Sequence, residues 1–379
     1  MDARGRTDRR KAPPGLCKGG RFAERLSAGL LALIAAISPA AAETTVRIAT
    51  FNTELAREGP GLLLRDTLSE DDPQVESVAR LIARATPDII ALQGIDYDHD
   101  LIAARALVRR ISAHGHDLPH VFALRPNTGM TTGLDLDGDG RKGRPRDAQG
   151  YGTFAGQGGM AILSRFPVLT EDVRDFSGIL WRDMPQALLR LEDGTPLLLD
   201  RVKKVQRLST VGHWVVPVRI EDQTLRLLTF HASPPVFDGP EDRNGRRNHD
   251  EIVFWLKYLD GAFGAGPEPP FVLAGDANLD PVDGAGRKAA IRRLLADGRM
   301  IDPKPMRPAG VAQGDGHDGD PRLDTVDWPG PDPGSLRVSY VLPSADLEVL
   351  KAGIVTDGMN GSVEDASRHG LVWVDLLLK

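Results

Sequence analysis

The sequence has almost no cysteine. Of its 379 residues only Cys17 is a cysteine, and a single cysteine cannot form a disulfide within the chain. A zinc site built from several thiolates is excluded for the same reason. Aromatic residues make up only 5% of the chain, whereas hydrophobic and charged residues make up 41% and 26%. This composition is typical of one large globular domain of the α/β or mixed class.

The sequence also lacks an apolar run that spans a bilayer comfortably, since a membrane helix needs roughly 20 apolar residues. The shorter run from Leu26 to Ile37 follows eight Lys and Arg side chains and precedes the small residues Ser38–Ala42. Basic, apolar and small-residue segments in this order are typical of a secretory signal peptide. We therefore expect cleavage after Ala42, a mature domain of residues 43–379 and a periplasmic or secreted location. An uncleaved membrane anchor is the alternative.

The mature chain is expected to be acidic. The predicted signal peptide has eight basic and three acidic side chains, so its removal changes the formal net charge from −6 to −11. A surface of this sign lacks the positive charge that duplex nucleic acids attract, although a bound metal ion can mask a local negative cleft. We therefore expect no stable nucleic-acid complex, and we expect a monomer without a membrane span.

Apolar patterns predict many strands with helices between some of them. The expected strands are 46–52, 87–93, 119–124, 158–164, 211–220, 224–231, 271–275, 336–342 and 371–376, and the expected helices are 74–85, 100–113, 249–260 and 286–296. These elements show no repeated period, which favours two packed sheets flanked by helices. The Gly-, Asp- and Pro-rich stretches 125–157 and 301–335 predict long surface loops that can form the rim of a site.

The strongest chemical motif is Gly275-Asp276-Ala277-Asn278, which follows a buried strand. Residues two apart on an extended segment point the same way, so the side chains of Asp276 and Asn278 are expected on one side. Such a pair can hold a water molecule together with a phosphate or a metal ion. The alternative is an Asx-rich turn that only closes the strand.

Three more polar residues stand at or just beyond the ends of predicted strands. They are Asn52 in T-F-N, His231 in L-T-F-H and His369 in S-R-H. The order F-N, D-I-I-A-L-Q, F-H, G-D-x-N, R-V-x-Y-V-L and S-x-H resembles the endonuclease/exonuclease/phosphatase superfamily over residues 46–376. This resemblance implies a four-layered, deoxyribonuclease I-like α/β sandwich whose site lies at one edge of two mixed or antiparallel sheets.

The resemblance also implies a role for each residue. Asp276 activates a water molecule for attack on phosphorus, and Asn278 helps to position that water. His231 and His369 bind or protonate phosphate oxygens, while Asn52 supports both the phosphate and the metal. The implied cofactor is Mg²⁺ or Mn²⁺, with Asn52 and Asp276 among its ligands. The implied substrate is a phosphate ester, and its class depends on loops that the motifs do not describe.

Three positions depart from the family pattern. Gly94 stands where a metal-binding glutamate is usual, Ser339 stands where an aspartate orients the last histidine, and Arg368 stands where an aspartate precedes that histidine. These changes weaken metal binding and the charge control of the histidine. Asp96 can compensate as a metal ligand, with Asp98 as a second candidate, and Arg368 can place a positive charge against a substrate phosphate. The alternative function is a catalytically impaired relative that binds a ligand or a protein.

Leu134–Arg141 contains the pattern D-x-D-x-D-G, which is typical of the start of a calcium-binding loop. The three carboxylates are those of Asp135, Asp137 and Asp139. The bidentate glutamate that usually closes such a loop is absent, because its position is taken by Arg146. The sequence therefore leaves two interpretations open, a structural Ca²⁺ site and a solvated acidic loop.

A polar segment follows His231 and precedes a predicted helix. Its residues 234–251 look like a variant found in secreted bacterial members of the superfamily. The guanidinium groups of Arg243, Arg246 and Arg247 can bind a phosphate or carboxylate near the site, and Arg243 is predicted to contact substrate. The alternative is a charged surface loop with a helix cap.

Overall fold

The computed structural model describes residues 43–308, 316–330, 332–356 and 366–379. The predicted signal peptide, residues 1–42, lies outside this described part. Residue contacts join Ala42–Lys379 into one unit. None of the helices in the described ranges is long and apolar enough to cross a bilayer.

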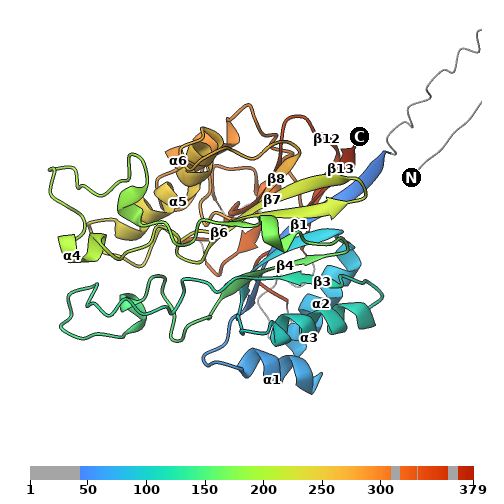
Figure 1. The fold of residues 1–379 in the computed structure, drawn as a ribbon, viewed down its shortest axis with the longest axis horizontal. Coiled ribbons are helices and arrows are strands. Elements are labelled where there is room, and N and C mark those ends of the chain that lie inside the picture. Colours follow the sequence, from blue (N-terminus) through green and yellow to red (C-terminus); the bar gives the residue numbers. More distant parts are fainter. Residues whose placement is uncertain (1–42, 309–315, 331, 357–365) are drawn as a thin grey trace, which may run out of the picture. The chain divides into compact units, whose positions relative to one another are not determined.

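Two mixed sheets form the centre of this unit (Figure 1). The first sheet has six strands in the order β12-β13-β1-β2-β4-β3, and β1 is parallel to β2. The second has five strands in the order β11-β8-β7-β6-β5, and β7 is parallel to β8. The strands are β1 (Thr44–Leu55), β2 (Ile89–Ile95), β3 (His120–Phe122), β4 (Gly159–Ser164), β5 (Arg174–Asp175), β6 (His213–Ile220), β7 (Gln223–His231), β8 (Phe271–Asp276), β11 (Ser339–Pro343), β12 (Glu348–Val355) and β13 (Leu371–Leu378), with β9 (Val326–Asp327) and β10 (Ser335–Leu336) forming a separate pair.

Both sheets are apolar on both faces. In β1 the side chains of Val46 and Ile48 belong to the core between the sheets, whereas Ala49 and Phe51 belong to the core beneath helices. Successive side chains of a strand lie on opposite faces, so this pattern requires cover on both sides. A strand buried on both faces is a near-continuous apolar run, as the sequence V-R-I-A-T-F is.

Helices supply that cover. The first sheet packs against helices that precede and follow β2, and the second against helices on either side of β8. The helices are α1 (Leu62–Ser69), α2 (Pro73–Ala85), α3 (Ile102–Ala113), α4 (Asp200–Lys203), α5 (Arg243–Leu259) and α6 (Ala289–Leu295). Helix α2 begins where the carboxylate of Asp72 accepts a hydrogen bond of 2.8 Å from the Val75 N–H and Pro73 follows the cap.

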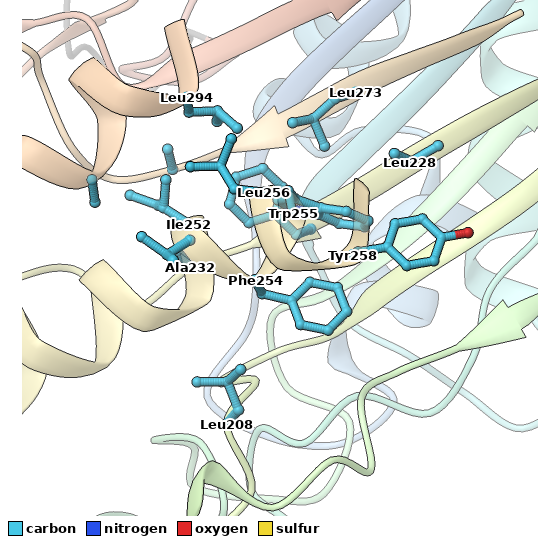
Figure 2. Close-up of a cluster of buried hydrophobic side chains, with 14 of the residues drawn as sticks. Leu208, Leu228, Ala232, Ile252, Phe254, Trp255, Leu256, Tyr258, Leu273 and Leu294 are labelled. Carbon is cyan, nitrogen blue, oxygen red and sulfur yellow. The ribbon is translucent and has the colours of Figure 1, made fainter. Parts of the chain in front are cut away.

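The core beneath α5 and α6 is rich in large side chains (Figure 2). Phe254, Trp255 and Tyr258 of α5 lie in it with Leu228 of β7 and Leu273 of β8, all buried. Aromatic side chains of this size dominate the energy of a core, so α5 is fixed firmly on the second sheet. The order helix, sheet, sheet, helix confirms the predicted four-layered sandwich.

Each predicted strand overlaps an observed one, but β5, β9, β12, α1 and α4 were not predicted, and α5 is longer than predicted. Strand β12 was not predicted, because an edge strand with an exposed Leu350 lacks a clear apolar alternation. Helix α5 begins at Arg243 rather than at residue 249. Its first turns are polar yet buried, since hydrogen bonds satisfy the side chains of Arg246, Arg247 and Asn248.

Candidate active site

Asp276 is the last residue of β8, and its side chain is fully buried. Because β7 runs parallel to β8 with His231 opposite Asp276, both strands deliver these residues to the same edge. Ser339 of the antiparallel β11 lies opposite Asp276 on its other side. In the first sheet, Asn52 stands near the corresponding end of β1. Strand direction therefore brings distant segments of the sequence together.

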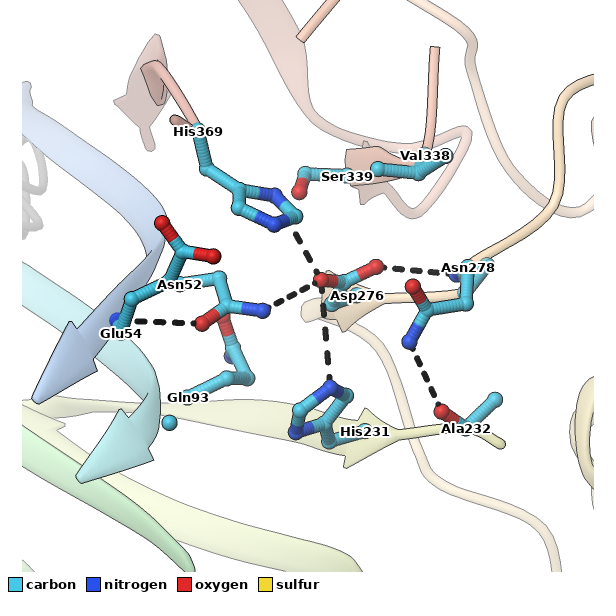
Figure 3. Close-up of polar contacts among 12 residues, drawn as sticks. Asn52, Glu54, Gln93, His231, Ala232, Asp276, Asn278, Val338, Ser339 and His369 are labelled. Atoms are coloured by element: carbon cyan, nitrogen blue, oxygen red, sulfur yellow. Dashed lines mark hydrogen bonds and ion pairs between the residues drawn. The ribbon is translucent and has the colours of Figure 1, made fainter. Parts of the chain in front are cut away.

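Polar side chains surround the carboxylate of Asp276 (Figure 3). The amide Nδ2 of Asn52 donates a hydrogen bond of 2.9 Å to Oδ2. The same oxygen lies 3.9 Å from Nε2 of His231 and 3.7 Å from Nδ1 of His369. The other oxygen, Oδ1, accepts a hydrogen bond of 2.9 Å from the backbone N–H of Asn278. The structure thus brings together all four predicted catalytic residues and Asn52.

The position of Asn278 depends on a left-handed backbone, with φ 49°. Its side-chain Nδ2 donates a hydrogen bond of 2.9 Å to the carbonyl oxygen of Ala232. Asn278 therefore ties the segment after β8 to the segment after β7, in addition to contacting Asp276 through its backbone.

Burial controls the charge of both histidines. It lowers the pKa of His231 and His369 below the ordinary value, and the negative charge of Asp276 opposes this effect only in part. Both imidazoles are therefore neutral at neutral pH. The buried Nδ1 atoms of both rings have no hydrogen-bond partner among the described residues. Unsatisfied buried nitrogens beside a carboxylate are suited to a ligand that brings its own oxygens.

Comparison with known proteins decides the family of the chain. The model of the endonuclease/exonuclease/phosphatase family matches residues 49–369, a range that includes every residue around Asp276. The chain belongs to this family. Its members are phosphoric ester hydrolases, which supports the predicted class of chemistry at the level of the family. A search of curated protein sequences gave no match.

Solved structures support the fold alone. An endonuclease/exonuclease/phosphatase from Beutenbergia cavernae DSM 12333 is 18% identical, with 88% of this chain and 72% of that chain covered and a TM-score of 0.50. A family protein from Bacteroides thetaiotaomicron is 12% identical, with 89% and 99% covered and a TM-score of 0.51. Both likenesses confirm the predicted deoxyribonuclease I-like architecture.

The structure explains why this endonuclease/exonuclease/phosphatase relative has glycine at position 94. Gly94 has φ 68°, and a Cβ atom there would lie 2.4 Å from Oδ1 of Asn52 and 3.1 Å from the backbone N of Glu54. The pairing of β1 with β2 shifts between Asn52 and Leu55, so β1 bulges toward Gly94. The bulge fills the space that a side chain at position 94 needs.

Glu54 is a site residue that the sequence analysis missed. Its carboxylate forms an ion pair with the guanidinium of Arg368 and accepts hydrogen bonds from the Ser367 hydroxyl and the Arg368 backbone N–H. Burial alone raises the pKa of Glu54, but the hydrogen bonds from Arg368 and the positive charge of its guanidinium bring it below the ordinary value. The alternation of an extended strand does not reveal it, because the backbone of Glu54 is left-handed and lies in the bulge of β1. Arg368, predicted to contact substrate, bonds Glu54 in the structure.

Ser339 changes how His369 is held. The hydroxyl of Ser339 is buried and has no hydrogen-bond partner among the described residues. His369 packs instead against the ring of Trp328, with centroids 5.7 Å apart at 87°, and its backbone N–H donates to the Ser367 hydroxyl at 3.1 Å. Backbone and packing contacts thus position this histidine without a carboxylate at position 339.

Asp96 is engaged elsewhere in the structure. Its two oxygens accept hydrogen bonds of 2.9 Å from the backbone N–H groups of Arg57 and Gly158. Burial raises its pKa above the ordinary value, although these bonds oppose the effect. Asp96 therefore anchors two loops, and its role as a metal ligand stays a prediction without support from these contacts.

The three arginines of α5 bond mainly to the protein itself. Arg243 donates to Gln206 Oε1 at 2.9 Å, Arg246 to the Arg190 carbonyl at 2.8 Å, and Arg247 to the carbonyls of nearby loops. These bonds give the polar segment a supporting role. Contact between Arg243 and substrate stays a prediction.

Asn248 and Glu251 of α5 hold the ends of the catalytic strands. Nδ2 of Asn248 donates hydrogen bonds of 2.7 Å to the carbonyls of both Ser233 and Ala277. The carboxylate of Glu251 accepts from the Ser233 N–H at 2.7 Å and from the Thr210 N–H. Ser233 follows β7 and Ala277 follows β8, so α5 fixes the segments that carry His231 and Asp276.

Asp135, Asp137 and Asp139 do lie together, with one ligand oxygen from each within 4.8 Å of the others. The backbone N–H groups of Gly138 and Gly140 donate to the carboxylate of Asp135 at 2.7 and 3.0 Å. The loop is exposed. Its geometry agrees with the predicted grouping and does not identify an ion.

Proposed function

We propose that this chain hydrolyses a phosphate ester by attack of an activated water molecule on phosphorus. The observation that carries the proposal is the buried Asp276 carboxylate, which faces Asn52 and two neutral histidines. A desolvated carboxylate is an effective general base, and imidazole N–H groups stabilise anionic phosphate oxygens. Family membership supports the same chemistry.

In this mechanism Asp276 accepts the proton of the attacking water. The bond from the water oxygen to phosphorus forms as the ester bond from phosphorus to the leaving oxygen breaks, and the leaving oxygen takes a proton from solvent. The hydrogen bond from Asn52 to Oδ2 and that from the Asn278 N–H to Oδ1 fix the plane of the Asp276 carboxylate. His231 and His369 bind the phosphate oxygens through their free ring nitrogens.

The proposal includes a divalent cation, Mg²⁺ or Mn²⁺. The amide oxygen of Asn52 and the carboxylate of Asp276 are hard oxygen donors of the kind these ions prefer, so the residues present fit such an ion. Asn52 and Asp276 would hold it. When bound, it would supply positive charge to the phosphate.

The Glu54–Arg368 ion pair favours a second candidate function. Arginine in place of an acidic residue beside His369 makes the site less negative and favours binding of an anionic ligand without turnover. Under this alternative the chain binds a phosphorylated or acidic partner, and the Asp276 site is catalytically impaired.

Export is part of the proposal. The N-terminal pattern of residues 1–42 supports cleavage after Ala42 and a periplasmic or secreted location. N-terminal sequencing of protein recovered outside the cytoplasm is expected to begin at Glu43. A chain that still begins upstream of residue 43 would favour the uncleaved anchor.

The decisive assay uses residues 43–379 with bis-p-nitrophenyl phosphate, p-nitrophenyl phosphate and DNA, each with Mg²⁺, Mn²⁺ or Ca²⁺. We expect metal-dependent release of product from at least one ester and its loss in Asp276→Asn. Binding of inorganic phosphate without hydrolysis of any ester would favour the alternative. Equal activity of the wild type and Asp276→Asn would contradict the proposed mechanism.

A further inference from the structure

Glu54 reaches the site through an unusual backbone. It has φ 50°, a left-handed conformation that is uncommon for a residue other than glycine, asparagine or aspartate. Its backbone N–H donates a hydrogen bond of 3.3 Å to Oδ1 of Asn52. A strained residue beside a catalytic group is a reason to ask what its side chain does.

The two carboxylate oxygens of Glu54 have different partners. Oε2 accepts hydrogen bonds from the Arg368 backbone N–H at 2.9 Å and from the Ser367 hydroxyl at 3.1 Å, and Nε of Arg368 lies 3.3 Å away. Among the described residues, Oε1 is bonded by the guanidinium alone, through Nε at 2.9 Å and through Nη2. Backbone and hydroxyl contacts therefore orient the carboxylate, while only a side chain covers Oε1.

That covering side chain borders solvent. The Arg368 side chain is 45% exposed, whereas that of Glu54 is 22% exposed. The ion pair is bidentate and Glu54 is largely buried, so the guanidinium leaves Oε1 only when another cation takes over its charge. Oε1 would then be available while the remaining bonds keep Glu54 in place.

We propose that Glu54 is a ligand of the divalent cation, in place of the side chain that Gly94 lacks. The proposal rests on the proposed function. Asn52 links the two positions, because its Oδ1 bonds the Glu54 N–H and lies 2.4 Å from where a Cβ atom on Gly94 would be. One strand's bulge thus excludes a side chain from position 94 and supplies a carboxylate from position 54. Arg368 is the counter-ion of Glu54 when the metal is absent.

Substitutions of Glu54 and of Arg368 are expected to change metal affinity in opposite directions. Glu54→Gln removes a charged oxygen ligand and should weaken Mn²⁺ binding at least tenfold. Arg368→Gln removes the competing cation and should tighten Mn²⁺ binding severalfold. A residue that only supports the fold would not produce opposite signs from the two halves of one ion pair.

Glu76→Gln is a matched control. Glu76 has a side chain 25% exposed and pairs with Arg110 at 2.8 Å on helices α2 and α3. Glu76→Gln therefore loses a comparable ion pair with an arginine, but outside the Asp276 site. This variant should leave Mn²⁺ affinity unchanged.

The experiment is calorimetric titration of residues 43–379 with Mn²⁺, with every protein carrying Asp137→Ala so that the acidic loop does not contribute. Weaker binding by Glu54→Gln with tighter binding by Arg368→Gln supports the proposal, and thermal melts establish that both variants are folded. Equal affinity of the wild type and Glu54→Gln, weaker binding by Arg368→Gln, or no binding by the wild type overturns it. Ester hydrolysis is measured in parallel, so a wild type that hydrolyses esters while Glu54→Gln binds Mn²⁺ normally refutes the ligand role alone.

Discussion

A Cβ atom on Gly94 would lie 2.4 Å from Oδ1 of Asn52. The φ of 68° at Gly94 also disfavours any residue with a side chain, at a cost of roughly 1–2 kcal/mol. Gly94→Ala should therefore lower the free energy of unfolding by about 1 kcal/mol or more and displace Asn52. We also expect Gly94→Glu to impair the site rather than restore a family-like ligand there. Chemical denaturation and ester hydrolysis measure both effects.

Gly298→Ala is the control for this prediction. A Cβ atom on Gly298 would meet no atom of the described residues within 4 Å, and its φ lies outside the left-handed range. Gly298→Ala should leave the free energy of unfolding and the activity nearly unchanged. A rise in metal-dependent activity of Gly94→Glu, alone or with Ser339→Asp, would show that the space at position 94 is available and would refute our account of the bulge.

Asn248 bonds two carbonyls at once, those of Ser233 and Ala277. Asn248→Ala leaves both buried carbonyls unsatisfied and should cost about 2–4 kcal/mol of stability. It should also lower the turnover rate, because the segments that follow His231 and Asp276 lose one of the links between them. Asn244→Ala on the same helix loses one bond, to the Val236 carbonyl, and should have a smaller effect on both. Equal turnover rates in the two variants would contradict a role of Asn248 in positioning His231 and Asp276.

The elements around Asp276 could be predicted because each strand ends in a polar residue. The proximity of Asp276 and His231 could be predicted without knowing the strand register, because the ends of parallel strands meet at one edge of a sheet. Glu54 could not be predicted in the same way, because the bulge that turns it toward Arg368 depends on the pairing of β1 with β2. The sequence predicted that the arginines of α5 lie near a phosphate. It could not show that their guanidinium groups bond carbonyls of the protein, because these contacts depend on how distant loops pack.

The loss of stability at acidic pH is predicted to depend on His213. Burial lowers its pKa to about 4, from an ordinary value of 6.5. As the pH falls from 6.5 to 4 the unfolded chain takes up a proton that the folded chain does not, so the folded state loses up to about 3 kcal/mol. His213→Gln should lose less stability over this interval.

His99→Gln serves as the control, because His99 has a side chain 94% exposed. Urea denaturation at several pH values between 7 and 4 measures the slope for the wild type and both variants. A slope in His213→Gln as steep as that of the wild type would exclude His213 as the source.

Calcium is predicted to bind at Asp135, Asp137 and Asp139, whose oxygens are already grouped. Ca²⁺ at about 100 times its Kd should stabilise the folded state by roughly 2.7 kcal/mol. Asp137→Ala should lose this rise in melting temperature. Asp200→Ala, at a carboxylate 91% exposed, should keep it. No thermal shift in the wild type would leave the solvated acidic loop as the correct interpretation.

Hydrolysis in ¹⁸O-labelled water tests the central claim that Asp276 activates water for attack on phosphorus. With bis-p-nitrophenyl phosphate as substrate, we expect ¹⁸O in the phosphate product and none in p-nitrophenol. We also expect Asp276→Asn to lower the rate by about 10²-fold or more, since general-base catalysis contributes on this order. Label in p-nitrophenol, or an undiminished rate in Asp276→Asn, would contradict the account.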